Sequence, residues 1–267
     1  MAGEMKRTIG GHLTLSGGTR TIVKTVRPWQ PKLVFPATKE DCPFCSKSQE
    51  DEFTPGMGWK TFKNSNTPWP YHRLLIPTTC WEEEGLRSLG GRATLDVALR
   101  LAFNEVLRTR PANWAPIWIY THIGYGAGQN FPHHHWHINE PVTTPRPLNV
   151  EGEEELWQTD DFRVVVCGVR AGQTLIIPKK RRIFSSEVIS QLSREAWRVV
   201  HLFNEKFDSP DYCLFLGIND AVDEWYIRYT PVLNNWGGSE IAALDHGTPF
   251  VLPWPHAATV AYLKGES

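Results

Sequence analysis

Four histidines fall within five residues of the segment Gly128-Gln129-Asn130-Phe131-Pro132-His133-His134-His135-Trp136-His137-Ile138-Asn139, directly behind a glycine-rich loop. In a β-strand, successive side chains point to opposite faces, so His133, His135 and His137 share one face while His134 and Trp136 share the other. Histidine acts near neutral pH as a nucleophile, a proton carrier or a metal ligand, and each role needs its partner close by. The segment therefore predicts an ordered, chemically active strand. A surface histidine tract and a bare metal cluster are the alternatives.

The expected secondary structure repeats along the chain. The first part reads as strands at residues 59–62 and 72–77, a helix at about 92–108, a strand at 116–122 and the histidine strand. The second part gives the same order: 162–169, 173–178, a helix at 186–207, 212–217 and 224–229. Two short matches support the repeat, Leu74-Leu75-Ile76-Pro77 with Leu175-Ile176-Ile177-Pro178, and Trp136-His137-Ile138 with Trp225-Tyr226-Ile227. The repeat predicts an α+β chain with two related halves, residues 1–145 and 146–267, of which only the first kept its histidines. Coincidence between two ordinary α+β segments is the alternative.

The charge balance narrows the class of partner. The 28 basic and 29 acidic residues of this 267-residue chain nearly cancel, to a net charge of −1. A nucleic-acid-coating surface or a polybasic membrane face is therefore not expected, and the partner is expected to be a small molecule. The chain has no apolar run of bilayer length, and its N-terminus lacks the apolar segment of a secretory signal. We expect a soluble, cytoplasmic protein without a membrane partner.

Three separated motifs point to a known family. They are Arg27-Pro28-Trp29-Gln30, Cys42-Pro43-Phe44-Cys45, and the loop of residues 124–130 followed by Pro132-His133-His134-His135. Together they resemble the galactose-1-phosphate uridylyltransferase branch of the histidine triad superfamily, and residues 62–77 resemble the strand-turn-strand of histidine triad proteins generally. The resemblance covers about residues 20–141. It implies two histidine-triad-like halves, each an antiparallel sheet with a packed helix, arranged as an intramolecular pseudo-dimer.

The resemblance also implies a covalent mechanism. An imidazole nitrogen that attacks an α-phosphorus forms a phosphoramidate and splits one displacement into two easier ones. The family implies His135 as this nucleophile. His137 lies one alternation further along the same face, where it can donate to the same phosphate or to the leaving oxygen. Negative charge on the phosphoryl oxygens needs donors fixed in advance, which the loop backbone and the side chains of Gln129 and Asn130 can supply. The nucleotide and phosphate contacts expected from the resemblance are Arg27, Asn64, Gly128 and Asn130, with Asn64 on the ribose hydroxyls.

The Cys42/Cys45 pair predicts metal or redox chemistry in a reducing compartment. Structural zinc needs four nitrogen or sulfur ligands. The resemblance places the third ligand just after the strand that ends in Ile76-Pro77, where this chain has Cys80, and takes His133 as the fourth. This closed site would hold structural Zn²⁺. Free thiols, with His133 only orienting His135, are the alternative.

Two features separate this chain from the uridylyltransferase pattern. Those enzymes end the motif with glutamine where this chain has His137, and they are longer. The leading interpretation is an enzyme, a nucleotidyltransferase that carries a nucleoside monophosphate through a nucleotidyl-His135 to a sugar phosphate or similar phosphorylated acceptor. The alternatives are a hydrolase or phosphorylase of dinucleoside polyphosphates or nucleoside phosphoramidates, and a zinc-stabilised nucleotide-binding module without turnover. The sequence leaves homodimerisation open.

Overall fold

The computed structural model describes residues 11–14, 20–23, 42–46, 51–64, 67, 69, 71–81, 85, 87–110, 116–124, 126–127, 129, 133–140, 152–167, 171–180, 185–208, 210–219, 224–233 and 256–266. The boundary at residue 145, which divides the two expected halves, lies outside these residues. So do three of the expected site residues, Arg27, Gly128 and Asn130.

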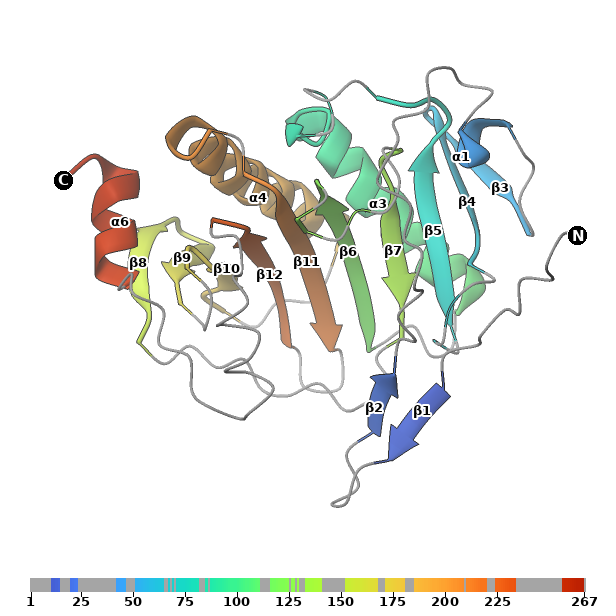
Figure 1. The fold of residues 1–267 in the computed structure, drawn as a ribbon, viewed down its shortest axis with the longest axis horizontal. Coiled ribbons are helices and arrows are strands. Elements are labelled where there is room, and N and C mark those ends of the chain that lie inside the picture. Colours follow the sequence, from blue (N-terminus) through green and yellow to red (C-terminus); the bar gives the residue numbers. More distant parts are fainter. Residues whose placement is uncertain are drawn as a thin grey trace, which may run out of the picture.

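Ten strands form one antiparallel sheet, which confirms the α+β class (Figure 1). Their order across the sheet is β3 (Phe53–Gly56), β4 (Trp59–Lys63), β5 (His72–Pro77), β7 (Trp136–Asn139), β6 (Ile117–Ile123), β11 (Tyr212–Asn219), β12 (Glu224–Pro231), β10 (Thr174–Pro178), β9 (Phe162–Val166) and β8 (Glu154–Gln158). A separate hairpin pairs β1 (Gly11–Thr14) with β2 (Arg20–Val23). From either outer edge the sheet begins with three strands consecutive in sequence, and β6 and β11 meet as its central pair.

Two long helices, α3 (Arg92–Thr109) and α4 (Ser186–Lys206), cover the same face of the sheet (Figure 1). Helix α3 packs against β5 and β7, and α4 against β10 and β12. Both bury the residues that their helical spacing predicts: Leu95, Leu99, Ala102 and Val106 in α3, and Ile189, Leu192, Ala196, Val199 and Phe203 in α4. Helix α6 (His256–Lys264) lies beside β8, and the short α1 (Pro43–Ser46) lies against β4. Among the described residues, no helix is long and apolar enough to cross a membrane.

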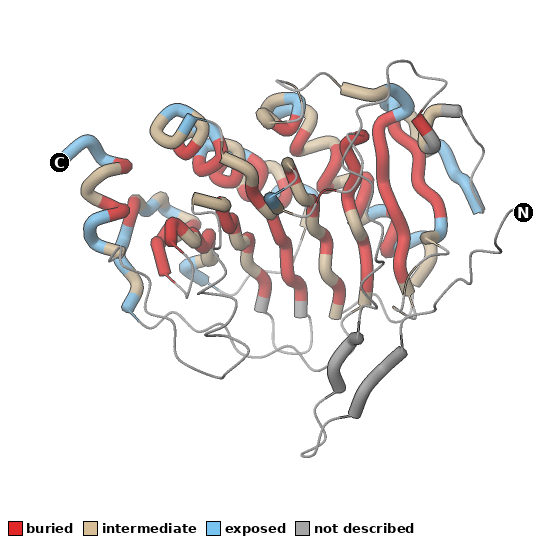
Figure 2. The backbone as a smooth tube through the Cα atoms, in the orientation of Figure 1, coloured by how far each residue is buried: buried red, intermediate tan, exposed pale blue. Residues whose placement is uncertain are grey.

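The alternation in β6 defines the two faces. Ile117, Ile119 and Ile123 are buried toward the helices, whereas Trp118, Tyr120 and His122 are only partly buried on the other face, which we call the open face. Figure 2 shows this alternation of buried and partly buried residues, and the central strands are buried along most of their length. Aromatic and polar side chains therefore gather at the middle of the open face.

The strand register corrects one of the two short matches. Leu74 of β5 pairs with His137 of β7, and its counterpart Leu175 of β10 pairs with Arg228 of β12. In the central strands, Tyr120 pairs with His137 and Phe215 pairs with Arg228. The residue at the position of His137 is therefore Arg228 and not Tyr226, two residues from the match read in the sequence.

A buried ion pair joins the sheet to α3. Arg73 of β5 and Glu105 of α3 are each at least 95% buried and contact each other, and Arg108 also contacts Glu105 at 2.7 Å. Because Glu105→Gln leaves the buried guanidinium without its buried counter-charge, we expect a loss of about 3 kcal/mol in unfolding free energy. The exposed Asp51, 2.6 Å from Arg73, offsets only part of this loss.

Urea unfolding measures the loss of unfolding free energy in Glu105→Gln. Asp96→Asn, which breaks the more exposed pair with Arg100, is the control and should cost less than about 1 kcal/mol. Equal effects in the two variants would contradict the argument.

Candidate active site and metal centre

The histidine segment leads into the start of β7, and every second residue of it faces the open face. The hydrogen-bonded strand starts only at Trp136, but the expected alternation holds through the preceding residues. His133 and His135 both contact the ring of Phe44, and His135 lies 4.9 Å from His137 between ring centroids. On the helix side, His134 stacks on Trp81. The structure thus brings His133, His135 and His137 together on one face.

His135 is held in one tautomer. Its Nδ1 lies 2.8 Å from the backbone carbonyl of His133, and because a carbonyl only accepts, Nδ1 carries the proton. Thr121 donates to the carbonyl of His135 at 2.8 Å and fixes the backbone. Burial lowers the pKa of His135, so the ring is neutral at pH 7. Its Nε2 therefore has a free lone pair, which is what a nucleophile needs.

His137 is oriented by His72, which the sequence analysis did not assign to the site. His72 Nε2 lies 2.8 Å from His137 Nδ1. On the other side of the ring, Thr67 accepts from the backbone N–H of Trp69, so its hydroxyl proton is available to His72 Nδ1 at 2.6 Å. Burial lowers the pKa of His72 to about 4, so the ring has a single N–H at pH 7, on Nε2. His72 then donates to His137 Nδ1, and a neutral His137 carries its own proton on Nε2.

Asn64, expected on the ribose, lies at the end of β4 beside the same ring. Its Nδ2 is 3.4 Å from His72 Nδ1, and its backbone N–H donates to the carbonyl of His72. It therefore sits close enough to the histidines to belong to one site with them.

Three cysteines and one histidine form a compact cluster on the same face. The Sγ atoms of Cys42, Cys45 and Cys80 lie 3.2 to 3.5 Å from His133 Nδ1, and the four ligand atoms all lie within 4.8 Å of one another. His133 Nε2 donates to the carbonyl of Pro77 at 2.8 Å, which leaves Nδ1 unprotonated toward the sulfurs. Tetrahedral zinc with bonds of about 2.3 Å places its ligand atoms about 3.8 Å apart. These residues thus fit a closed zinc site, and they are the four that the sequence analysis named.

The glycine-rich loop is held by the protein itself. Gly124 N–H donates to Gln129 Oε1 at 2.8 Å, Gln129 N–H returns to the carbonyl of Gly124, and Gly126 N–H donates to Asp211. Gly124 has φ +86°, and a Cβ there would collide with the Asp211 carboxylate, so only glycine fits. These three N–H groups are not available to a phosphate, contrary to the expectation for this part of the loop. Gln129 Nε2 is buried without a hydrogen-bond partner and remains as a donor.

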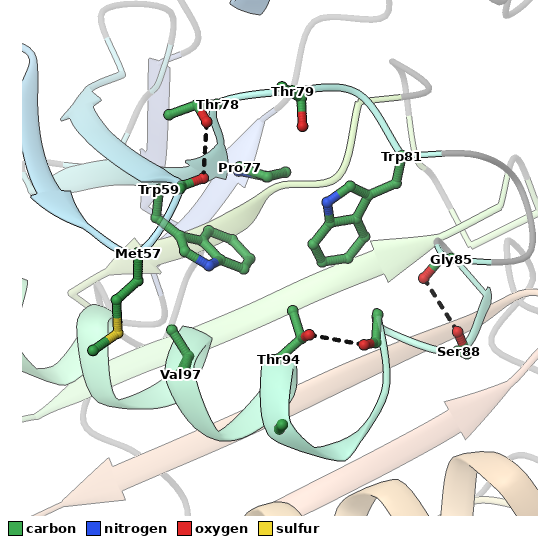
Figure 3. Close-up of a pocket in the computed structure, with 13 residues that line it drawn as sticks. Met57, Trp59, Pro77, Thr78, Thr79, Trp81, Gly85, Ser88, Thr94 and Val97 are labelled. Carbon is green, nitrogen blue, oxygen red and sulfur yellow. Dashed lines mark hydrogen bonds between the residues drawn. The ribbon is translucent and has the colours of Figure 1, made fainter.

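A cavity of about 710 Å³ lies on the helix side of the sheet, behind the histidines. Trp59 and Trp81 line it side by side above the first turns of α3, with their rings edge to face at 5.7 Å (Figure 3). His135 and His137 do not line this cavity, so it is separate from the site on the open face.

The chain matches no protein-family model, and no curated protein is similar to it in sequence. Its structure, however, is similar to several solved structures. A uridylyltransferase superposes with a TM-score of 0.71 at 13% identity, over 96% of this chain and 97% of that one. An ADP-glucose phosphorylase from Arabidopsis thaliana, solved with bound ADP-glucose, gives 0.67 at 13% identity over 85% and 91%. A GalT-like protein from the same plant gives 0.63 at 14% identity over 84% and 91%. The fold of this chain is therefore similar to that of a uridylyltransferase, as the resemblance in sequence led us to expect.

Proposed function

We propose that this protein is a nucleotidyltransferase that works through a covalent nucleotidyl-His135. The observation that carries the proposal is the tautomer of His135, whose Nδ1 proton is given to the carbonyl of His133 and whose Nε2 lone pair is free on the open face. The two neighbouring histidines of the segment that point to the same face have different tasks, since His133 turns Nδ1 to three thiols and His137 accepts from His72.

In the first step, His135 Nε2 attacks the α-phosphorus, an N–P bond forms, and the bond from phosphorus to the leaving oxygen breaks. His137 Nε2–H donates to the phosphoryl group or the leaving oxygen. In the second step, an oxygen of a phosphorylated acceptor attacks the phosphorus and the N–P bond breaks. Gln129 Nε2 supplies a further donor to the phosphoryl oxygens, which carry charge throughout.

The remaining contacts of the proposal come from the sequence. Asn64 is assigned to the nucleotide, and Arg27, Gly128 and Asn130, which lie outside the described residues, to the phosphates. The symmetric strand order supports two histidine-triad-like halves arranged as a pseudo-dimer, with residues 1–145 catalytic and residues 146–267 completing the sheet. Zn²⁺ bound by Cys42, Cys45, Cys80 and His133 would be structural, and no chemical step passes through it.

A second candidate is a hydrolase or phosphorylase of the same covalent type. His137 favours it, because this position is glutamine in the uridylyltransferase pattern, and a similar solved structure is an ADP-glucose phosphorylase. The two candidates share the first step and differ in whether an acceptor phosphate, inorganic phosphate or water takes the nucleotidyl group.

Intact-protein mass spectrometry tests the proposal. The protein is exposed briefly to UDP-glucose, UTP, ATP or diadenosine tetraphosphate and kept alkaline, since phosphoramidates are acid-labile. A nucleotide-sized adduct that persists until a sugar phosphate is added supports the transferase. Steady release of monophosphate, or consumption of inorganic phosphate, without an accumulated adduct supports the second candidate. Binding with neither adduct nor turnover would overturn both and leave a nucleotide-binding module.

His72 offers a sharper test of the tautomer argument. Because His72→Phe removes the donor to His137 Nδ1, we expect the rate of adduct formation to fall by about 10- to 100-fold, with the apparent donor affinity little changed. His72→Gln keeps an N–H donor and should recover part of the rate. Single-turnover kinetics measure both variants. Equal losses in the two, or a loss confined to donor affinity, would show that His72 serves only packing.

A further inference from the structure

A row of side chains crosses the open face from the catalytic half into the second half. His137, Tyr120, Phe215 and Arg228 are direct cross-strand neighbours on β7, β6, β11 and β12. The rings of His137 and Tyr120 stack at 4.7 Å, those of Tyr120 and Phe215 at 6.1 Å, and the Arg228 guanidinium lies 4.8 Å from the centre of the Phe215 ring. Arg228 thus leans toward the catalytic histidines and not toward the outer strands.

Arg228 has no acidic partner among the described residues. It forms no ion pair or hydrogen bond there, and its contact is the face of Phe215. The sequences of β5, β6, β7, β10, β11 and β12 contain a single acidic residue, Glu224, which lies four positions away along β12, about 13 Å. A half-buried arginine that is stacked on an aromatic ring and lacks a counter-charge is well suited to bind an anion.

Tyr120 adds a hydrogen-bond donor to the row. Tyr120 lies between His137 and Phe215, and its hydroxyl has no hydrogen-bond partner among the described residues. Burial raises the pKa of Tyr120, so the phenol stays protonated and remains a donor. The row therefore presents a phenol donor, an aromatic surface and a guanidinium in that order, leading away from the reacting phosphorus.

We propose that Arg228 forms a subsite for a distal anionic group of the second substrate or leaving group. Since Phe215 lies two strand spacings from His137, the guanidinium is roughly 10 Å from that ring. A phosphate near that distance from the α-phosphorus occurs in a polyphosphate chain or in a phosphate ester on the far side of a sugar. The shared chemistry is a phosphate dianion or polyphosphate, held by Arg228 beyond the aromatic pair. This inference rests on the proposed function for the placement of the α-phosphorus at His135.

Arg228→Gln tests the subsite, with Arg198→Gln as its matched control. Arg198 lies 4.2 Å over the Trp157 ring on the helix side, so its replacement also removes a stacked arginine without touching the open face. In calorimetric titration with inorganic tripolyphosphate, we expect Arg228→Gln to weaken binding by about 10- to 100-fold and Arg198→Gln by less than about twofold. Arg228→Lys should fall between them, since it keeps the charge but loses the stacked plane. Equal affinities for wild type and Arg228→Gln would overturn the subsite.

Kinetics distinguish the source of the anion. With Arg228→Gln, the KM should rise for diadenosine tetraphosphate if a polyphosphate fills the subsite, or for glucose 1,6-bisphosphate as acceptor if a sugar phosphate does. UDP-glucose, which has no charge beyond its pyrophosphate, should react unchanged. Adduct formation in a protein whose tripolyphosphate binding ignores Arg228 would sink the subsite and leave the proposed function standing. Tripolyphosphate binding that depends on Arg228, in a protein that forms no adduct, would overturn the proposed function and leave an anion site at Arg228.

Discussion

Replacing His135 by alanine is expected to abolish the nucleotide adduct and to lower turnover by at least about 10⁴-fold, as loss of a covalent nucleophile does in other enzymes. The reason lies in the assignment of the three imidazoles. Only His135 has a proton committed to a backbone carbonyl and a lone pair that neither thiols nor another histidine occupy. Neither of its neighbours can take over without giving up its own contacts.

The measurement is intact mass after a pulse of donor, followed by peptide mapping of the modified residue. His201→Ala is the control, because His201 is an exposed histidine on α4, on the opposite side of the sheet from the open face. It should form the adduct at the wild-type rate. If His135→Ala retained more than about a tenth of the wild-type rate, the mapped peptide would have to carry the nucleotide on another residue, and the tautomer argument would fail.

The sequence was most informative where chemistry follows from local spacing. The period of a strand puts His133, His135 and His137 on one face whether or not the hydrogen-bonded strand has begun, so the prediction held although β7 starts only at Trp136. The Cys42/Cys45 pair indicated a metal or redox site by its spacing, and the resemblance added Cys80 and His133, which the structure brings together with it. Helical spacing predicted the buried faces of α3 and α4 for the same reason.

The sequence was least informative where a contact depends on strand order. His72 acts on His137 only because β5 and β7 are neighbours, and nothing in the residues around His72 signals this. Asp211 reaches the glycine-rich loop only because β11 pairs with β6 at the centre of the sheet. The edge strands β3 and β8 were missed because they are short and largely exposed.

The strand register also bears on the role that we propose for the second part of the chain. Short sequence matches aligned Tyr226 with His137, yet the hydrogen-bond ladder aligns Arg228 with it. If the halves arose by duplication, an imidazole that handles a phosphoryl group in one half stands where a guanidinium stands in the other. Both residues lie against the aromatic residue that pairs with them in the central strands. In the functions that we propose, His137 in one half and Arg228 in the other would then both contact an anionic group, although their side chains differ.

Removal of the metal is the second large effect that we expect. Without a cation, burial and the neighbouring thiols raise the pKa of Cys80 to about 12, so three thiols and an imidazole are packed within contact distance with little to stabilise them. Zinc would convert the thiols to ligated thiolates and add its binding free energy to folding. We expect one zinc per chain, and a loss of at least about 3 kcal/mol in unfolding free energy in Cys42→Ala, with the metal absent.

Cys167→Ala is the matched control for the metal site. Cys167 is as buried as Cys42 but lies outside the cluster, so its replacement leaves a small cavity and should cost about 1 kcal/mol with zinc retained. Chelation of the wild-type protein should lower its unfolding free energy as much as Cys42→Ala does. Chelation of the Cys42→Ala protein should have no further effect. Equal losses in both variants, or a wild type without zinc, would contradict a structural metal.

Metal loss should also slow the chemistry without touching the nucleophile. The four clustered side chains join α1 to the histidine segment, and Phe44 of α1 contacts both His133 and His135. When His133 is released, its carbonyl no longer has a fixed place from which to hold the Nδ1 proton of His135. Adduct formation in Cys42→Ala should therefore fall, and restoring folding with a stabilising osmolyte should not restore the rate. Full recovery of the rate on refolding would show that zinc supports the fold alone.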